Sequence, residues 1–211
     1  MAKANNGILG AVRGKVGNLI FYIQAGEACV RIAGKRRAAL TPAERINTEK
    51  FALLMNLFRP MKPFLKLGFS SPDRSSKQNY HNRATAFNRK HAVKLVNGRP
   101  EIAFEKVLLA QGTGLRATDA EASLVAGALQ FTWSYDPEAD WEAGADQAMF
   151  MAYFPESDYA VYELAGAKRA TCADVLQLPN SLLTQRMELY IAFASTDRER
   201  IADSVYLGRI N

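Results

Sequence analysis

The chain has 211 residues, of which 48% are hydrophobic and 10% aromatic, and its formal net charge is +6. This composition argues against a disordered chain and provides the apolar side chains of a substantial core. The two cysteines, Cys29 and Cys172, lie far apart and form no CxxC pair, which argues against a disulfide framework and a zinc site.

We expect a soluble protein without an export signal. The first apolar run, 8–12, is too short for a signal peptide, and no apolar segment approaches the length that spans a bilayer. The expected location is therefore cytoplasmic, or the virion if the protein is derived from a phage.

Charge is distributed unevenly along the chain. Residues 1–100 contain 19 Lys/Arg and 4 Asp/Glu, whereas residues 101–211 contain 8 and 17. Such asymmetry predicts two domains, or one face made for an acidic partner. The alternative is that each half keeps an ordinary solvated charged surface.

The N-terminal region is rich in glycine. Four glycines within 5–17 favour an extended segment with tight bends over a helix. The apolar runs 19–23 and 29–32 then predict a β-hairpin. Gly14-Lys15 suggests a phosphate-binding loop, but Leu9 occupies the place of its first glycine, and we predict no nucleotide site.

A helix is predicted after the hairpin. Residues 41–44, Thr-Pro-Ala-Glu, form a capping box with proline at the first helical position. Apolar side chains recur through Phe58, and Pro60 and Pro63 are expected to break or kink the chain beyond that residue. We interpret the apolar stripe as core, with a groove for a partner as the alternative. Three consecutive cations precede this helix: Lys35, Arg36 and Arg37.

A second helix is predicted over 77–94, where an apolar stripe is surrounded by cations and asparagines. Cations neutralise phosphates and asparagine positions or reads bases, so this region is the best nucleic-acid candidate in the chain. A basic solvated face is an equally good interpretation. The asparagines are Asn79, Asn82 and Asn88. The predicted contacts to nucleic acid or an acidic partner are Lys35, Arg36, Arg37, Lys77, Arg83, Arg89, Lys90 and Lys94.

The C-terminal half alternates short apolar runs with Gly, Pro, Asp and Asn, which predicts strands. The strongest signal is 128–135, where Leu129, Phe131, Trp133 and Tyr135 alternate with small polar residues and point to one face. Strands at this spacing indicate a β-sandwich or barrel. The predicted strands are 103–109, 122–125, 129–135, 148–154, 159–164, 170–178, 187–195 and 204–210.

Three segments of this half resemble a fibronectin type III module: 131–133 (Phe-Thr-Trp), 176–179 (Leu-Gln-Leu-Pro) and 190–194 (Tyr-Ile-Ala-Phe-Ala). That family carries a tryptophan on its second strand and a Leu-x-Pro turn before an alternating strand that begins with tyrosine. The resemblance covers residues 104–211 and implies an antiparallel sandwich. The usual Thr-x-Tyr after the proline is spread out here by 180–187, which departs from the family's tyrosine corner but not from the sandwich.

The N-terminal part has a resemblance of its own. The segments 6–10 (Asn-Gly-Ile-Leu-Gly) and 14–18 (Gly-Lys-Val-Gly-Asn), with Val30-Arg31, resemble a family of uncharacterised bacterial proteins of about this length. Similar Gly-Lys-Val-Gly segments occur in phage-associated proteins. The resemblance implies a two-part architecture and a viral or assembly context, and it assigns no catalytic residue.

No motif indicates catalysis. The chain has no Gly-x-Ser-x-Gly, no His-Glu-x-x-His and no G-x-G-x-x-G after a strand, and its two histidines, ten residues apart, predict no metal site. An acidic cluster around Trp141 offers oxygens to Ca²⁺ or an indole to a carbohydrate, but it lacks EF-hand spacing, and we interpret it as a solvated loop. Its members are Asp136, Glu138, Asp140, Glu142 and Asp146. We predict no enzyme, no cofactor and no metal.

As a whole, the sequence predicts an α+β chain with two domains: residues 1–102, a basic region with a hairpin and two helices, and residues 103–211, an acidic β-sandwich of fibronectin type III or immunoglobulin type. We expect a non-catalytic structural or interaction protein, a component of a phage-like or other large assembly in which the basic half of one subunit contacts the acidic half of the next. The alternative is a nucleic-acid-binding protein that uses the basic half. The expected partners are other proteins or further copies, then nucleic acid, and not a membrane.

Overall fold

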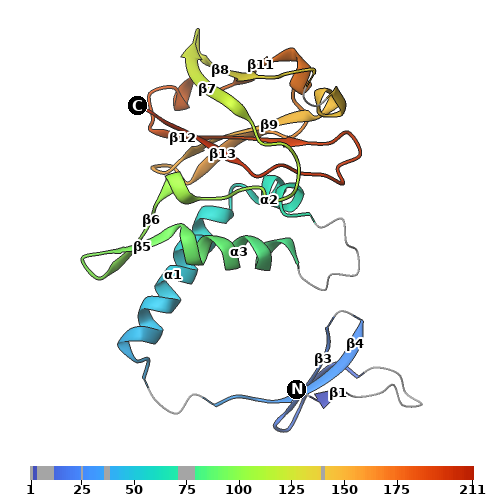
Figure 1. The fold of residues 1–211 in the computed structure, drawn as a ribbon. Helices are drawn as coiled ribbons and strands as arrows, with labels where there is room; N and C mark the ends of the chain where they lie inside the picture. Colours follow the sequence, from blue (N-terminus) through green and yellow to red (C-terminus); the bar gives the residue numbers. More distant parts are fainter. Residues whose placement is uncertain (1, 4–11, 25, 36–38, 71–78, 139–140) are drawn as a thin grey trace. The chain divides into compact units, whose positions relative to one another are not determined.

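The computed structural model describes residues 2–3, 12–24, 26–35, 39–70, 79–138 and 141–211. The chain divides into two compact units, unit 1 (Met1–Pro42) and unit 2 (Ala43–Asn211). Figure 1 shows their elements. The described residues form α-helices and antiparallel sheets, so the predicted α+β class is confirmed. None of the described helices is long and apolar enough to cross a membrane.

Unit 1 is an antiparallel sheet in the order β1-β4-β3-β2. Its strands are β1 (Ala2–Lys3), β2 (Gly14–Val16), β3 (Leu19–Gln24) and β4 (Glu27–Ile32). β3 and β4 form the predicted hairpin, and Gly26 in its turn has a φ of 80°, which glycine adopts because it has no Cβ. The predicted extended segment lies outside the described residues up to residue 11, and its remainder contains β2.

Three helices come next in the sequence: α1 (Pro42–Phe58), α2 (Lys62–Gly68) and α3 (Tyr80–His91). α1 begins and ends where the sequence predicts, at Pro42 and just before Pro60. Pro63 does not break the chain, because it lies in the first turn of α2, where proline's missing N–H costs no helical hydrogen bond.

α3 ends earlier than predicted, and its capping residue Ala92 leads directly into a second hairpin. The hairpin pairs β5 (Val93–Val96) with β6 (Arg99–Ile102). Asn97 and Gly98 between them have φ values of 50° and 78°, the left-handed conformations that a two-residue hairpin turn requires. Turn chemistry therefore overrides helical periodicity after residue 92.

Two larger antiparallel sheets complete unit 2, in the orders β10-β9-β12-β13 and β11-β8-β7. Their strands are β7 (Thr118–Val125), β8 (Ala128–Ser134), β9 (Gln147–Phe154), β10 (Tyr159–Glu163), β11 (Ala173–Gln177), β12 (Met187–Ala194) and β13 (Val205–Ile210). Each overlaps a predicted strand. Short stretches of 3-10 helix lie before and between them: η1 (Phe104–Lys106), η2 (Trp141–Ala145), η3 (Arg169–Thr171) and η4 (Asn180–Leu182).

The strand predicted over 103–109 is wrong. This stretch contains η1 and then an extended segment whose hydrogen bonds go to side chains instead of a neighbouring strand. Leu108 donates its N–H to Asn88 Oδ1 at 2.9 Å and accepts from Asn88 Nδ2 at 2.8 Å. Leu109 donates to Ser204 Oγ at 2.8 Å. Because these side chains satisfy the buried backbone, the segment needs no strand partner.

β9 and β12 are the centre of unit 2, since every residue of β12 is buried. Side chains alternate along a strand, so Phe150 and Phe193 point to one face of their sheet, where they meet Phe131 and Trp133 of β8. The rings of Phe131 and Phe150 stack with centroids 4.6 Å apart, and Trp133 meets Phe193 edge-on at 5.4 Å. The two larger sheets thus share one apolar core.

The opposite face of β9 and β12 packs against the helices. Met149, Met151 and Tyr190 belong to the same core cluster as Phe58 of α1 and Phe64 of α2. Figure 1 shows the resulting arrangement, with helices on one side of the β9–β12 sheet and the β7–β8–β11 sheet on the other. The predicted core role of α1 is confirmed, because its last turn is buried here.

The boundary expected between residues 102 and 103 falls inside unit 2. Helices before that point and strands after it share a core cluster, and close backbone contact joins them. Gln111 donates its N–H to the Gly68 carbonyl at 2.8 Å. A Cβ at Gly68 would lie 2.4 Å from the Leu109 carbonyl oxygen, so only glycine allows α2 to approach this closely.

Candidate functional site

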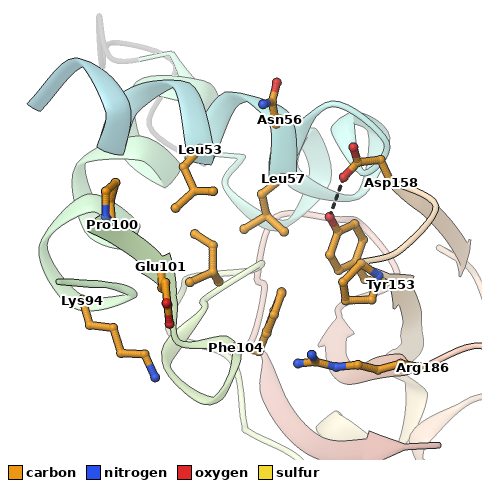
Figure 2. Close-up of a pocket in the computed structure, with 12 residues that line it drawn as sticks. Leu53, Asn56, Leu57, Lys94, Pro100, Glu101, Phe104, Tyr153, Asp158 and Arg186 are labelled. Atoms are coloured by element: carbon orange, nitrogen blue, oxygen red, sulfur yellow. Dashed lines mark hydrogen bonds between the residues drawn. The ribbon is translucent and has the colours of Figure 1, made fainter. Parts of the chain in front are cut away.

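A pocket of about 580 Å³ opens in unit 2 where α1, the β5–β6 hairpin, η1 and the end of β9 meet (Figure 2). Its wall is built from segments that lie far apart in the sequence, so only the folded chain brings them together. Its lining includes Leu53, Leu57, Lys94, Glu101, Ile102, Phe104, Tyr153, Asp158 and Arg186.

The floor of the pocket is apolar. Leu53 and Leu57 are one helical turn apart on α1, so both point to the same side, and Figure 2 shows them facing Phe104 and the Tyr153 ring. Leu57 and Tyr153 are each only 4% exposed, which fixes the floor as part of the core of unit 2. The accessible part of this floor suits an apolar group of a ligand.

The rim carries charges of both signs. Lys94 and Glu101 are cross-strand partners in the β5–β6 hairpin, and Arg186 and Asp158 lie at the far side. Asp158 Oδ1 accepts a hydrogen bond of 3.1 Å from the Tyr153 hydroxyl. Burial raises the pKa of Tyr153, and the neighbouring Asp158 carboxylate raises it further, so the hydroxyl keeps its proton and remains a donor.

Glu188 and the Phe104 ring hold the Arg186 guanidinium in position. Its Nε donates to Glu188 Oε1 at 2.9 Å, Nη2 binds the same oxygen, and the guanidinium carbon lies 5.5 Å from the centre of the Phe104 ring. Glu188 is only 1% exposed, and its second oxygen accepts from the Tyr206 hydroxyl. The buried carboxylate is therefore fully engaged, and it orients the arginine at the pocket edge.

Tyr190 ties the pocket to the central sheet. Its hydroxyl donates to the Phe104 carbonyl at 2.8 Å, which anchors η1 on β12. Burial raises the pKa of Tyr190, and the charge of Glu188 adds to the effect, so this donor also stays protonated. The result is a preformed cavity with an apolar floor and fixed charges, an arrangement that suits binding.

A family of unknown function, DUF6266, matches residues 11–208. The chain belongs to this family. Comparisons with curated proteins and with solved structures give no match. The match agrees with the expected membership in an uncharacterised family of proteins of this length, and it includes residues of both units of this chain.

The structure places the predicted basic contacts of this DUF6266 protein in different settings. Arg89 and Lys90 are exposed in the last turn of α3, and exposed Lys94 follows on β5 at the pocket rim. Arg83 is half-buried, and its Nη1 donates to the Phe69 carbonyl at 3.1 Å, so it holds the end of α2. Lys35 is exposed in unit 1. The remaining candidates lie outside the described residues: Arg36, Arg37 and Lys77.

Two of the asparagines predicted to position or read bases have structural roles. Asn79 caps α3 by accepting from the His81 N–H at 2.8 Å. Asn88 is fully buried and bonded to Leu108, so it cannot contact a ligand. Asn82 remains exposed.

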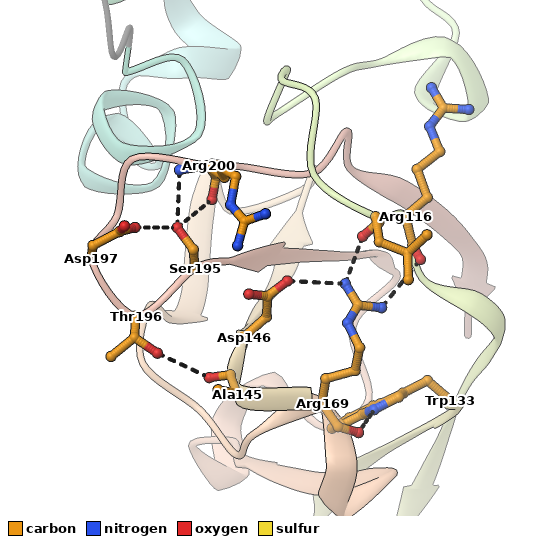
Figure 3. A network of polar contacts seen from close by, with 10 residues as sticks. Arg116, Trp133, Ala145, Asp146, Arg169, Ser195, Thr196, Asp197 and Arg200 are labelled. Atoms are coloured by element: carbon orange, nitrogen blue, oxygen red, sulfur yellow. Dashed lines mark hydrogen bonds and ion pairs between the residues drawn. The ribbon is translucent and has the colours of Figure 1, made fainter. Parts of the chain in front are cut away.

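The described carboxylates around Trp141 do not gather at one point that could hold a metal. Asp146 pairs with buried Arg169 at 3.8 Å, in a network where Arg169 also donates to the Leu115 carbonyl at 2.6 Å and its own carbonyl accepts from Trp133 Nε1 at 2.7 Å (Figure 3). Trp141 is 77% exposed, but it begins the 3-10 helix η2 and does not lie in the predicted loop. Asp140 lies outside the described residues, and among those described no group of three or more His, Cys, Asp or Glu is placed to hold a metal.

Sequence reasoning misses most of the pocket. The apolar pattern assigns Phe104 to a strand and Tyr153 to strand core, and neither Asp158 nor Arg186 belongs to a motif. A weak signal exists at 186–188, where an arginine and a glutamate flank the start of an apolar strand and could be expected to pair. Lys94 is the predicted contact that the structure brings to the pocket.

Proposed function

We propose that this protein is a non-catalytic interaction protein that binds a segment of a protein partner in the pocket of unit 2, as a component of a phage-like or other large assembly. The pocket carries the proposal: an apolar floor of Leu57, Phe104 and Tyr153 lies beneath a rim of two cations and two carboxylates. An apolar side chain of the partner fills the floor and supplies affinity, while charged neighbours pair with the rim and supply specificity.

We further infer that β7 to β13 form a β-sandwich of the fibronectin type III or immunoglobulin type. In such sandwiches strands A, B and E share one sheet and strands C, F and G the other. Here β7, β8 and β11 share one sheet, β9, β12 and β13 lie in the other, and β10 adds to β9 where a C′ strand would lie. Trp133 on the second strand supports the resemblance. Tyr190 differs from a tyrosine corner, because its hydroxyl bonds to Phe104 and not to a carbonyl a few residues upstream.

Panning a random peptide library on the immobilised full chain tests the proposal. We expect enriched peptides to share an apolar residue flanked by charges, and Leu53→Glu to abolish the enrichment because it places a carboxylate over the pocket floor. The matched control is Leu95→Glu, a leucine 49% exposed that does not line the pocket. No enrichment on the wild-type protein, or enrichment that survives Leu53→Glu, would contradict a peptide-binding pocket.

Nucleic-acid binding is a second candidate, which the cluster of exposed Arg89, Lys90 and Lys94 favours. If these cations meet phosphates, affinity falls steeply with salt, and the double variant Arg89→Glu, Lys90→Glu weakens binding to all sequences alike. An electrophoretic shift assay with DNA and RNA at low salt is the measurement. Absence of a shift there would end this candidate.

A further inference from the structure

A second, smaller cavity of about 250 Å³ lies between the end of α1 and the first turns of α2 and α3. Its lining residues are Met55, Phe58, Arg59, Lys62 and His81, and we call it the basic cavity. All five belong to unit 2 and to the described part of the chain, and none of them lines the larger pocket. The volume is below the roughly 300 Å³ at which pockets for drug-sized ligands begin, so it suits a small ligand group.

Every polar side chain that lines the basic cavity is a hydrogen-bond donor, and none is acidic. Arg59 and Lys62 carry positive charges, and the His81 imidazole has a ring N–H to donate even when it is neutral. From residue 50 to residue 100 the sequence contains a single acidic residue, Asp73, which lies outside the described residues. The cavity therefore gathers cations without a carboxylate in its own wall to balance them.

The two cations have donors left for a ligand. Within the described part of the chain, Lys62 makes no ion pair or hydrogen bond through its ammonium group. Arg59 makes one side-chain hydrogen bond, from Nη2 to Asn56 Oδ1 at 3.3 Å. Because a guanidinium has five N–H donors, most of those of Arg59 are available at the cavity.

His81 is oriented by ring contacts. Its imidazole meets the rings of Phe58 and Tyr80 edge-on, with centroids 6.1 and 6.2 Å apart, and the residue is half-buried. Its backbone N–H already donates to Asn79 Oδ1. The group that His81 offers to a ligand is therefore the ring and not the end of the helix.

Helix stability does not account for Lys62. This residue is the first of α2, a helix without an acidic side chain in its first turn. The unpaired N–H groups of a first turn carry partial positive charge, so a cation is unfavourable there. Arg59, in contrast, directly follows the last residue of α1, where a cation is favourable. A bound anion would offset the repulsion that Lys62 experiences.

We infer that the basic cavity binds the phosphate group of a phosphate monoester, with Arg59, Lys62 and His81 as the donors. Such a group carries a charge of about −1.5 to −2 at pH 7, which balances the two cations, and its oxygens accept charge-assisted hydrogen bonds from all three side chains. Met55 and Phe58 provide an apolar wall for the substituent on the ester oxygen. The inference goes beyond the peptide-binding pocket proposed for unit 2 and uses none of its residues.

The size of the cavity favours a single phosphate over a nucleic-acid backbone. Proteins that bind single strands use a charged groove that follows successive phosphates, with aromatic side chains on which the bases stack. The basic cavity is one small hollow, and its aromatic ring, Phe58, is only 1% exposed. A base therefore has no ring face to stack on here.

NMR spectra of the histidine rings in the full chain test the inference, because His81 and His91 are the two histidines of the sequence. At constant pH and ionic strength, phenyl phosphate should shift the His81 ring signals until they saturate. The signals of His91, at the other end of α3, should stay in place. The variant His91→Gln assigns the two sets. Inorganic phosphate should bind more weakly, because it lacks a ring to contact Met55 and Phe58.

Lys62→Gln and Arg59→Gln should each weaken the binding of phenyl phosphate about tenfold or more, because each removes a charge-assisted hydrogen bond. The matched control is Lys66→Gln, which removes the same charge from an exposed position of α2 that does not line the cavity. It should leave the affinity almost unchanged. Circular dichroism checks the fold of each variant, and none of the three substituted side chains is buried.

Three results would overturn the inference: no saturable shift of His81, equal shifts of both histidines, or equal losses of affinity in Lys62→Gln and Lys66→Gln. Tighter binding of inorganic phosphate than of phenyl phosphate would assign the cavity to the free ion instead. Tighter binding of a short thymidine oligonucleotide would assign it to nucleic acid, and either result overturns the monoester. None of these outcomes bears on peptide enrichment at the larger pocket.

Discussion

Arg169 illustrates at the residue scale how unit 2 satisfies a buried charge. Its side chain is 1% exposed, its guanidinium lies 3.6 Å from the centre of the Phe193 ring, and it donates to two carbonyls of the segment before β7. Its backbone carbonyl accepts the Trp133 indole N–H. One arginine thus connects the two larger sheets to the segment before β7, where Gly114 forms an isolated parallel bridge with Ala202.

The two tryptophans should differ sharply in their contribution to stability. Trp133 is 4% exposed and Trp141 77%. Trp133→Ala should lower the free energy of unfolding by about 3–5 kcal/mol, because it leaves a cavity and frees the Arg169 carbonyl. Trp141→Ala should change it by less than about 0.5 kcal/mol. Urea denaturation of the full-length variants measures both, and equal losses would show that the β8 assignment is misplaced.

Three tyrosines around the pocket should make the protein sensitive to alkali. Burial raises the pKa of Tyr153, Tyr190 and Tyr206, and nearby carboxylates, Asp158 and Glu188, raise it further. A raised tyrosine pKa means that the native state holds the proton more tightly than the unfolded chain. The stabilisation is therefore complete below the ordinary tyrosine pKa of about 10 and is lost as the pH rises above it.

Denaturant melts from neutral pH to about pH 12 test this expectation. The free energy of unfolding should fall less steeply above about pH 10 in Tyr153→Phe than in the wild-type chain, because one linked proton has been removed. Melts at neutral pH measure the stability that Tyr153→Phe loses with the hydrogen bond to Asp158. This loss is subtracted before the two pH profiles are compared. Parallel profiles of the two proteins would contradict the assignment.

At the scale of an element, α3 shows how a side chain on a helix can supply the backbone hydrogen bonds that a neighbouring strand would otherwise make. Asn88 projects from it and supplies both hydrogen bonds that the backbone of Leu108 would otherwise make in a sheet. This is why a segment with a strand-like apolar pattern, 103–109, lies beside a helix. The pattern predicts that the segment is buried, but the side chain of a residue 20 positions earlier decides its partner.

Removal of this side chain should loosen α3 from the core. Asn88→Ala leaves the buried Leu108 N–H and carbonyl without partners, and each such group costs about 1–3 kcal/mol. Asn82→Ala, on the exposed side of the same helix, is the matched control and should cost less than about 0.5 kcal/mol. Thermal or urea unfolding of both variants gives the comparison. A small loss for Asn88→Ala would mean that water replaces the amide.

At the scale of the whole molecule, unit 2 is a central sheet with apolar side chains on both faces. β9 and β12 send Phe150 and Phe193 toward the other sheet and Met151 and Tyr190 toward the helices. Such a sheet is stable only with both layers present, because each uncovered face would expose a row of large apolar side chains.

The two fragments of unit 2 should therefore behave differently. Residues 43–211 retain the helices and should unfold in one cooperative transition, whereas residues 103–211 expose the helix-facing side of β9 and β12 and should be unfolded or aggregated. Circular dichroism with urea melts, and light scattering for aggregation, compares them. A cooperative, monomeric 103–211 would show that the helices are not needed to complete the core.

Patterns between neighbouring residues are enough to predict the main local elements of the chain. Period-two alternation at 128–135 specifies β8, the Thr-Pro capping box starts α1, and the paired apolar runs at 19–23 and 29–32 specify the first hairpin, because each signal depends on neighbours along the chain. The apolar runs of β9 and β12 are continuous and do not alternate, which indicates a sheet that is buried on both faces. The runs do not indicate which elements cover those two faces.

Contacts between distant segments, in contrast, form only when the layers of unit 2 pack together. Leu53, Phe104, Tyr153 and Arg186 form one pocket because α1, η1, β9 and β12 pack around a common core, and no local pattern encodes that meeting. The hydrogen bonds between Asn88 and Leu108 likewise join residues that no local pattern pairs. Side-chain hydrogen bonds and packing across long sequence separations are satisfied only once the layers assemble, and they then override the local preference for strand or helix.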